Sequence, residues 1–359
     1  MCRDCTGHAG LWFDKFCDRW AVDGSGWTMT SSKQDQTHTK KAWIDTVTSG
    51  DVGEGDRISA YAIRLLRLIH ARAGRAEVFT TESRFVTGLG RSHPVENGFA
   101  WHWSLGVPFL PGSSVKGMVR SWAVTDIDSP PDEATLDRVF GQPGKVGEVC
   151  FLDAVPLGPV ELEADVMTPH YAGWNDEDLP GDWRSPKPIP FLTTARGTSL
   201  LFGLLQAETA TTDLDTVSSW LRDALAWAGG GAKTAVGYGR FRTDGQKLKE
   251  LDRRLVQEEQ ERDAQRKQYE AMRSPEGRWR LRLQGLSEEE LADRVRIHLE
   301  KEPIRDPNDR QAFARAVEST EAFSYWKRGK KQDSRTHTGK KKLRERARLV
   351  LGASGADSN

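Results

Sequence analysis

The residues around a Pro-Gly pair at 111–112 have the types and spacing of an anion-binding site. This pair suits a type II turn, since proline presets the first φ angle and glycine accepts the positive second one. Ser113 or Ser114 can then cap the helix that follows, and Lys116 and Arg120 project from it one turn apart. Free N–H groups at a helix N-terminus beside two cations predict a phosphate site. The alternative is an ordinary solvated helix face.

A second candidate is the glycine-rich loop at 229–234, Gly-Gly-Gly-Ala-Lys-Thr. It is no Walker P-loop, because Ala232 stands where a glycine must precede the lysine, and because the loop leads from a helix to a strand. Its backbone N–H groups can nevertheless approach phosphates closely, with Lys233 adding charge. A helix C-terminus that needs a positive φ would explain one glycine but not three in a row. We therefore predict a phosphate contact here.

The segment Gly-Leu-Gly-Arg-Ser-His at 88–93 begins like a dinucleotide fingerprint. His93 replaces the third glycine, and because a proline follows, no helix is expected to open there. We therefore expect no dinucleotide site here. Arg91 and His93 are still placed to approach a phosphate backbone.

Three histidines raise the possibility of RNA cleavage without a metal ion. A ribonuclease of this kind needs a general base with a pKa near neutrality, which histidine supplies. The candidates are His93, His102 and His170, and either Asp153 or Asp165 could orient one of them. A structural hydrogen bond or an RNA contact is the interpretation we favour for His170. No catalytic residue is therefore predicted, and an endoribonuclease that processes RNA remains the alternative.

The N-terminus gathers Cys2, Cys5, His8 and Cys17. The first three have a plausible metal-ligand spacing, but the distance to Cys17 matches no zinc module. Unrelated reduced thiols are the interpretation we favour, so neither a metal nor another cofactor is expected.

The elements that must position these residues follow a recognisable order. Apolar residues on one face and arginines on the other predict a helix at 58–73. From residue 78 to residue 242 the predicted order is β-α-β-β-α-β with long insertions, an α+β ferredoxin-like pattern with two helices on one sheet face. The same frame carries RNA-recognition modules, which contact single strands through a sheet face and its loops. The predicted segments are a strand at 78–86, the helix after 112, a short helix at 134–140 in an insertion, strands at 146–155 and 198–206, a helix at 214–227 capped by Asp213 or Asp215, and a strand at 235–241.

The composition separates a core domain from a charged extension. The chain has 359 residues, 29% of them charged, and a formal net charge of zero. No apolar run is long enough to cross a bilayer, so we expect a cytoplasmic protein with no membrane partner. We predict one domain at 1–245 and a helical extension at 246–359, with a solvated helix at 247–273 and two or three short helices at 279–317. The stretch 327–348 contains 11 Lys or Arg and two acidic residues. Such a basic tail can bind a phosphate backbone or an acidic partner, or it can serve only to keep the protein soluble.

Four stretches in order resemble the RAMP superfamily of CRISPR effector proteins, and among these the subunits of type III-B complexes. They are Pro111 to Gly117, Phe151 to Ala154, Asp165 to Tyr171 and Gly230 to Phe241. The segments at 88–90 and 188–192 fit the same resemblance, which covers residues 8–245.

The resemblance implies a modified ferredoxin-like (RRM-like) fold and a non-catalytic RNA-binding subunit of an antiviral ribonucleoprotein. Such a subunit lies near the crRNA 3′ end beside other RAMP subunits and helps to hold crRNA and target RNA, while a sibling subunit cleaves the target. The RNA-contacting elements of the family map onto two sets of residues in this chain. They are Ser113, Ser114, Lys116 and Arg120, and Gly230, Gly231, Lys233 and Thr234.

Overall fold

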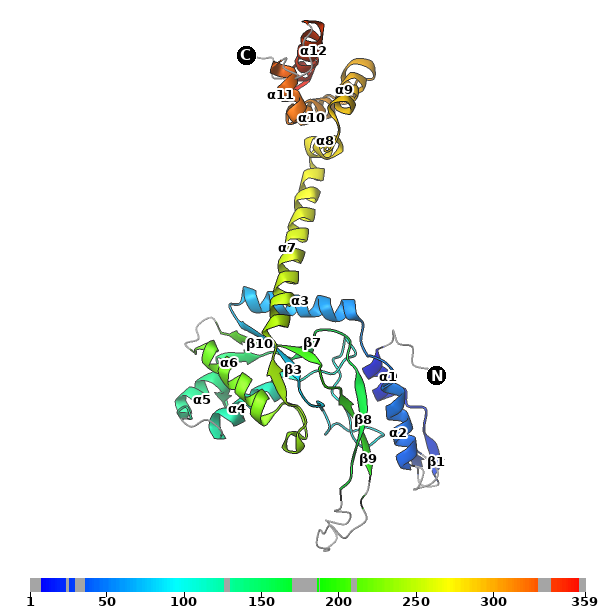
Figure 1. Cartoon of the computed structure of the whole chain (residues 1–359), viewed down its shortest axis with the longest axis vertical. Helices are drawn as coiled ribbons and strands as arrows, with labels where there is room; N and C mark the ends of the chain where they lie inside the picture. The colour runs from blue at the N-terminus through cyan, green and yellow to red at the C-terminus, as the bar shows by residue number, and fades with distance from the viewer. Residues whose placement is uncertain are drawn as a thin grey trace. The chain divides into compact units, whose positions relative to one another are not determined.

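The computed structural model of the chain describes residues 8–23, 26–29, 36–125, 130–169, 186, 188–207, 212–328 and 337–354 (Figure 1). The chain divides into two compact units, residues 1–255 and 256–359. Helices and antiparallel sheets both contribute, which confirms a mixed α and β protein. No helix in these described ranges is long and apolar enough to span a membrane.

An antiparallel sheet forms the centre of the first unit. Its strands run in the order β11-β3-β10-β6, and the short strand β7 also pairs with β10. The central strand β10 is apolar along most of its length because both of its faces are covered, with Leu200 and Leu201 both buried. The strands are β3 (Arg75–Thr81), β6 (Val149–Phe151), β7 (Val155–Pro156), β10 (Ser199–Gln206) and β11 (Phe241–Thr243).

Three helices pack on one face of this sheet. They are α4 (Gly112–Thr125), α5 (Glu133–Phe140) and α6 (Leu214–Asp223). Val115 and Val119, four residues apart on α4, join Val217 and Leu221 of α6 around Phe202 of β10. This spacing places each pair on one face of its helix, as the sequence predicted.

The opposite face of the sheet is covered as well. Helix α3 (Gly55–Ala71) and the first turns of α7 (Gly245–Arg273) bury Leu66 and Leu251 against Val78 and Leu201. An open sheet face, which RNA-recognition modules use, is therefore not available on these strands. Any contact with a nucleic acid here has to come from loops and helix ends.

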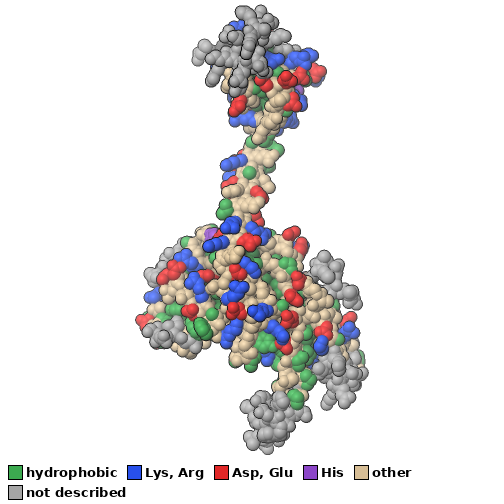
Figure 2. All heavy atoms as spheres, viewed as in Figure 1, with side chains coloured by type: hydrophobic (Ala, Val, Ile, Leu, Met, Phe, Trp, Pro, Cys, Tyr) green, Lys and Arg blue, Asp and Glu red, His purple; other side chains and the backbone are tan. Residues whose placement is uncertain are grey.

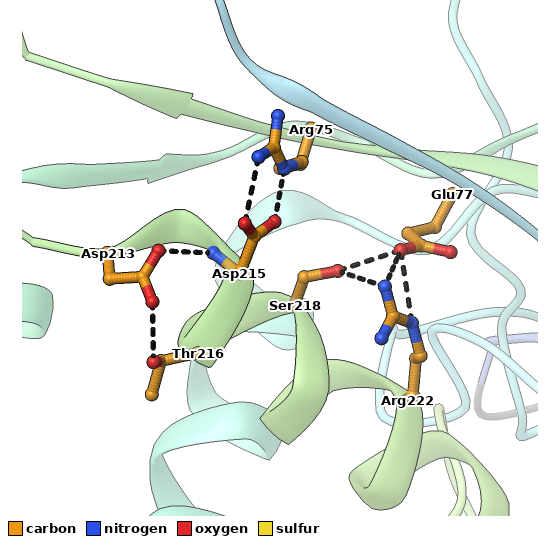
Figure 3. A network of polar contacts seen from close by, with 7 residues as sticks. All are labelled: Arg75, Glu77, Asp213, Asp215, Thr216, Ser218 and Arg222. Atoms are coloured by element: carbon orange, nitrogen blue, oxygen red, sulfur yellow. Dashed lines mark hydrogen bonds and ion pairs between the residues drawn. The ribbon is translucent and has the colours of Figure 1, made fainter.

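Polar contacts fix α6 across β3 (Figure 3). The Arg75 guanidinium donates to both carboxylate oxygens of Asp215, with Nη2 at 3.0 Å from Oδ2. Ser218 Oγ donates to Glu77 Oε1 at 2.8 Å. Asp213 accepts from the Asp215 N–H at 3.0 Å, which confirms it as the predicted cap of this helix.

A second core lies under the N-terminal elements of the same unit. Phe13, Trp43, Val95 and Trp101 are buried together there. The elements around this core are α1 (Ala9–Lys15), α2 (Gln36–Val47) and the hairpin of β8 (Leu162–Met167) and β9 (Ile189–Thr194). Two short hairpins complete the unit, β1 (Ala21–Asp23) with β2 (Gly26–Thr28) and β4 (Gly141–Gln142) with β5 (Lys145–Val146).

Several predicted boundaries were wrong. The segment at 235–241 is not a strand: residues Thr234–Val236 form a 3-10 turn (η2), and β11 begins only at Phe241. Glycines at 237 and 239 hold positive φ angles, which an extended strand does not use. The stretch from Asp165, which carries the family resemblance, begins within strand β8, because Asp165 to Met167 pair with β9. The helix at 214–227 ends in a π-helical turn, η1 (Ala224–Ala228).

The second unit is helical and has a core of its own. Phe313 and Trp326 are fully buried in it, among leucines and alanines of the neighbouring helices. The predicted helices within 279–317 are confirmed, and the solvated helix at 247–273 is α7, whose residues after Leu255 are mostly exposed. The helices are α8 (Pro275–Leu283), α9 (Glu288–Val295), η3 (Arg296–Lys301), α10 (Pro307–Glu318), α11 (Glu321–Arg328) and α12 (His337–Ser354).

Candidate functional site

A cleft of about 500 Å3 brings together the three segments that the sequence singled out. One wall is the loop at 87–90, another is α4, and the third is the glycine-rich loop at 228–234. Every described residue that lines the cleft is uncharged. Helix α4 contributes Ser114, Gly117, Met118, Ser121 and Trp122.

The N-terminus of α4 is capped by a residue that we did not predict for this role. The Gly112 N–H donates to Asp153 Oδ1 at 2.6 Å, and the N–H groups of Ser114 and Val115 donate to the Pro111 carbonyl. Capping by Ser113 or Ser114 was therefore wrong, since both lie inside the first turn. The carboxylate of Asp153 already occupies the positive end of this helix, where we had expected a phosphate.

The predicted type II turn is also absent. Gly112 is the first residue of α4 and has no positive φ. A Cβ atom at this position would lie 2.2 Å from the Phe151 carbonyl oxygen, so glycine is required by the close approach of two backbones. A type II turn and a close backbone contact would each favour glycine at position 112. The tertiary structure shows that the contact is the reason.

The two cations of α4 do not line the cleft. With about 3.6 residues per turn, Lys116 and Arg120 project from a different part of the helix than Ser114 and Ser121, which do line it. Lys116 is half-buried and Arg120 is exposed. The helix therefore presents small and apolar side chains to the cleft and its positive charge elsewhere.

The glycine-rich loop is packed against the chain itself. Gly231 has φ +90°, and a Cβ there would lie 2.2 Å from the Val86 carbonyl oxygen. The Ala232 N–H donates to that same oxygen at 2.8 Å, and the Gly230 N–H donates to the Gly239 carbonyl at 2.8 Å. These two N–H groups are therefore used internally. Those of Gly231 and Lys233 have no hydrogen-bond partner within the described part of the chain.

Lys233 and Thr234 have different surroundings. Lys233 is half-buried, and its backbone adopts the left-handed conformation. Its Nζ lies 5.4 Å from the centre of the Phe191 ring on β9. Such a contact is favourable because the ring face is negative. Thr234 lines the cleft. Of the predicted RNA-binding residues, the cleft therefore unites Ser114, Gly231 and Thr234 but not the two lysines.

A polar cluster that we did not predict fixes the far end of this loop. The Tyr238 hydroxyl and the Arg84 guanidinium both donate to Asp165 on β8, and Arg84 Nε lies 2.8 Å from Glu163 Oε2. Burial and the hydrogen bond to Asp165 raise the pKa of Tyr238 to about 12. Burial would raise the pKa of Asp165, but its hydrogen bonds and the Arg84 charge hold it below the usual range. The cluster thus keeps a charged carboxylate under the loop.

The histidines have structural contacts. The His93 ring stacks on Phe13 with centroids 4.2 Å apart, and its Nε2 lies 3.0 Å from the Phe13 carbonyl oxygen. Burial lowers the pKa of His93 and of His102, whose ring meets the edge of Tyr61. His170 lies outside the described residues. Of the two carboxylates proposed to orient a histidine, Asp153 caps α4 and Asp165 binds Arg84 and Tyr238.

Arg91 and the described N-terminal residues lie outside this cleft. Arg91 is exposed and lines a separate cavity of about 110 Å3 with Lys15 and Trp103. His8 caps α1: its Nδ1 accepts from the Leu11 N–H at 2.9 Å, and its Nε2 lies 2.8 Å from the Trp103 carbonyl oxygen. Burial raises the pKa of the Cys17 thiol. Cys2 and Cys5 lie outside the described residues, and no cluster of metal-binding side chains occurs among those that are described.

Comparisons with known proteins identify the family. A sequence profile of the RAMP superfamily matches residues 78–242. A protein of Pyrococcus furiosus, "CRISPR system Cmr subunit Cmr6", is 30% identical over an alignment of 241 residues, and the match covers 49% of this chain and 69% of that protein. The Cmr6 subunit of Saccharolobus solfataricus is 28% identical over 198 residues, covering 52% of this chain and 65% of that protein. The chain belongs to the RAMP superfamily and, within it, to the Cmr6 family.

Two solved structures are also similar in part. A chain of a type III-B Cmr-beta complex bound to cognate target RNA matches with a TM-score of 0.48 and 22% identity, over 60% of this chain and 74% of that one. The crystal structure of Cmr6 from Pyrococcus furiosus matches with a TM-score of 0.33 and 27% identity, over 48% of this chain and 97% of that one.

Proposed function

We propose that this chain is a non-catalytic RNA-binding subunit of a type III-B CRISPR effector ribonucleoprotein. In this role it holds the 3′ region of crRNA together with target RNA, beside other RAMP subunits, in antiviral defence. Its membership of the Cmr6 family supports the place in an effector complex. The observation that carries the RNA-binding role is the cleft in which α4 and the glycine-rich loop face each other.

The chemistry of the cleft suits a nucleotide of a single strand. The N–H group of Gly231, which has no partner among the described residues, is a donor for a phosphate oxygen, and Met118 and Trp122 on α4 offer an apolar wall for a sugar or a base. Single strands are commonly held through stacking and backbone contacts of this kind. The volume of about 500 Å3 also lies within the range of small-ligand sites.

The charge of the first unit favours such a local site over a broad basic surface. Residues 1–255 contain 28 Lys or Arg and 33 Asp or Glu. On the face shown in Figure 2, side chains of both signs are interspersed. Because the unit as a whole carries excess negative charge, attraction of a polyanion must come from specific groups.

The sheet also supports a ferredoxin-like frame for this function. The elements β3, α4, β6, β10, α6 and β11 follow each other along the chain, and the edge strand β11 pairs with β3. This arrangement supports a ferredoxin-like unit with insertions. Because helices cover both sheet faces, we assign the RNA to the loop end of the unit.

The absence of catalysis is part of the proposal. General acid–base cleavage needs imidazoles that reach the substrate, whereas His93 stacks on Phe13 and its ring is almost fully buried. Incubation of the full chain with labelled CRISPR repeat RNA and no metal tests this point, and we expect intact RNA. Specific cleavage that His170→Ala abolishes would instead establish the endoribonuclease.

Gly117 offers a direct test of the cleft. It lines the cleft from α4, and a Cβ atom there meets nothing within 4 Å, so the first carbon of a side chain can be added without a clash. We expect Gly117→Glu to weaken binding of a labelled single-stranded RNA about tenfold, the factor that roughly 1.4 kcal/mol produces. Gly117→Ala should bind as wild type does, and Gly117→Lys at least as well. Equal affinities for the Glu and Lys variants would contradict RNA binding in this cleft.

A further inference from the structure

A second cavity of the first unit lies among its N-terminal elements. Its volume is about 110 Å3, and it is lined by α1, by Arg91 and by the turn that leads from Trp101 to Pro108. Trp101 is buried in its wall, whereas Trp103 is 83% exposed and Leu11 is 50% exposed. Because both exposed side chains line one cavity, they form an apolar patch rather than single scattered residues. Such a patch is typical of a surface on which another molecule docks.

The backbone holds Trp103 in a fixed position. Its carbonyl oxygen lies 2.8 Å from Nε2 of His8 on the neighbouring segment. The turn itself is closed by the His102 N–H, which donates to the Val107 carbonyl at 2.8 Å, and by the Gly106 N–H, which donates to the His102 carbonyl at 3.0 Å. An aromatic side chain on a fixed backbone loses little conformational entropy when a partner covers it.

Helix α1 contributes one of its faces to the same cavity. Leu11, Asp14 and Lys15 all line it, and their spacing of three and four residues places them on one side of the helix. The other side of α1 is buried, because Phe13 belongs to the second core of the unit. The face around Leu11 is thus the outer face of this helix.

The charges around the cavity favour an acidic partner. Lys15 and Arg91 are exposed, and neither forms an ion pair with a described residue. The third charged group, Asp14, is half-buried, with its Oδ1 3.8 Å from Nε2 of His93, and burial raises its pKa. Two exposed cations therefore border the cavity in a unit whose acidic residues outnumber its basic ones. Carboxylates of a partner would be attracted here, and cations would be repelled.

The size of the cavity favours a protein side chain over a nucleotide. Small-ligand sites measure about 300 to 1,000 Å3, whereas this cavity measures about 110 Å3. Leu11, Trp101 and Trp103 give it apolar walls. One apolar side chain can fill such a space, and a nucleotide is too large for it.

We infer that Leu11, Lys15, Arg91 and Trp103 form a docking patch for a partner protein, which inserts one apolar side chain beside Trp103 and places carboxylates against Lys15 and Arg91. An aromatic residue beside a small pocket, surrounded by polar groups, is the usual form of a binding hot spot. The inference goes beyond the proposed function, because it involves no RNA and no residue of the cleft. It assigns Arg91 to a protein contact.

Short labelled peptides test the charge and the apolar anchor of the partner. The first peptide carries a central leucine between glutamates, the second has lysines in place of the glutamates, and the third has alanine in place of the leucine. We expect the full chain to bind the first peptide at least about tenfold more tightly than either of the others. Equal affinities for the glutamate and lysine peptides, or no binding of the glutamate peptide, would overturn the inference.

Two pairs of variants locate the peptide on the chain. Trp103→Ala should weaken binding of the glutamate peptide about tenfold, whereas Trp227→Ala, at a tryptophan that is 71% exposed outside this cavity, should not. Arg91→Glu should weaken binding, whereas Arg196→Glu, at another exposed arginine of the same unit, should not. All four side chains are exposed, so thermal unfolding of each variant should match the wild type. Equal losses within either pair would contradict the docking patch.

Other occupants of the patch give different results. If Trp103→Ala abolishes binding of a labelled single-stranded RNA, the patch binds RNA and the inference is wrong. If light scattering shows a dimer of the full chain that Trp103→Ala dissociates, a second copy covers the patch and the inference is wrong as well. Equal RNA affinities of Gly117→Glu and Gly117→Lys would refute the proposed role of the cleft and leave the docking patch unaffected.

Discussion

Tyr238 donates its hydroxyl to the carboxylate of Asp165, 73 residues earlier in the chain, and so ties the glycine-rich segment to strand β8. Arg84 donates to the same carboxylate from the segment after β3. One charged group therefore joins the end of the loop to two other parts of the fold. The cleft wall formed by this loop depends on that junction for its position.

This junction predicts an alkaline limit to stability. The pKa of Tyr238 is about 12 in the folded chain, against about 10 for an unfolded one. Because the folded state holds this proton more tightly, the contribution to the free energy of unfolding is complete below pH ~10 and lost as the pH rises from about 10 to about 12. Denaturant titrations across this range should show a steeper loss for the wild type than for Tyr238→Phe. Tyr269→Phe, at a tyrosine that is 67% exposed, is the matched control and should follow the wild type.

Asp153 should stabilise α4 as its cap. Asp153→Ala leaves the Gly112 N–H without its acceptor, and losses of this kind are about 1 kcal/mol. We expect Asp153→Asn to lose less, because an amide oxygen still accepts. Urea unfolding measures both. Asp132→Ala, which removes the cap of α5, shows how much stability such a cap provides in this chain. An Asp153→Ala variant as stable as the wild type would show that the cap of α4 contributes nothing.

Alanine substitutions at two glycines of the cleft should change the stability of the chain in opposite directions. Gly231→Ala places a Cβ against the Val86 carbonyl at a φ of +90°, so we expect destabilisation by more than about 1 kcal/mol. Gly117→Ala adds a methyl group to an open position inside α4 and should stabilise the chain by up to about 1 kcal/mol. Thermal unfolding of both variants separates the two effects. Similar shifts for both would mean that the loop does not hold the backbone described here.

Lys116 and Lys233, which the sequence predicted to contact RNA, should contribute to RNA binding through their charge and not through a contact in the cleft. Neither Lys116 nor Lys233 lines the cleft, so Lys116→Ala and Lys233→Ala should weaken RNA binding by less than Gly117→Glu does. Their effect should fade as salt is raised, because salt screens the attraction between charges that are not in direct contact. Anisotropy titrations at low and high salt provide the measurement. A loss in either variant that persists at high salt would place that lysine in direct contact with the RNA.

Local patterns in the sequence were enough for the helices and for the choice of segments. The apolar spacing of Val115 and Val119, the cap at Asp213 and the apolar run of β10 depend on neighbours a few residues away, and the structure confirms each of them. The motifs at 88–90, 111–117 and 229–234 were likewise recognisable by type and order, and the first and last of them meet α4 in one cleft.

The identity of the groups around that cleft was decided by tertiary structure. Whether Gly112 serves a turn or a backbone contact, and whether Asp153 orients a histidine or caps a helix, depends on which distant segment lies opposite. The same holds for the cations, because the rotation of α4 turns Lys116 away from the cleft, and the Nζ of Lys233 lies over the Phe191 ring instead of lining the cleft. Sequence spacing determines what a residue can do locally, while burial and pairing with remote groups determine which charges remain free to bind a ligand.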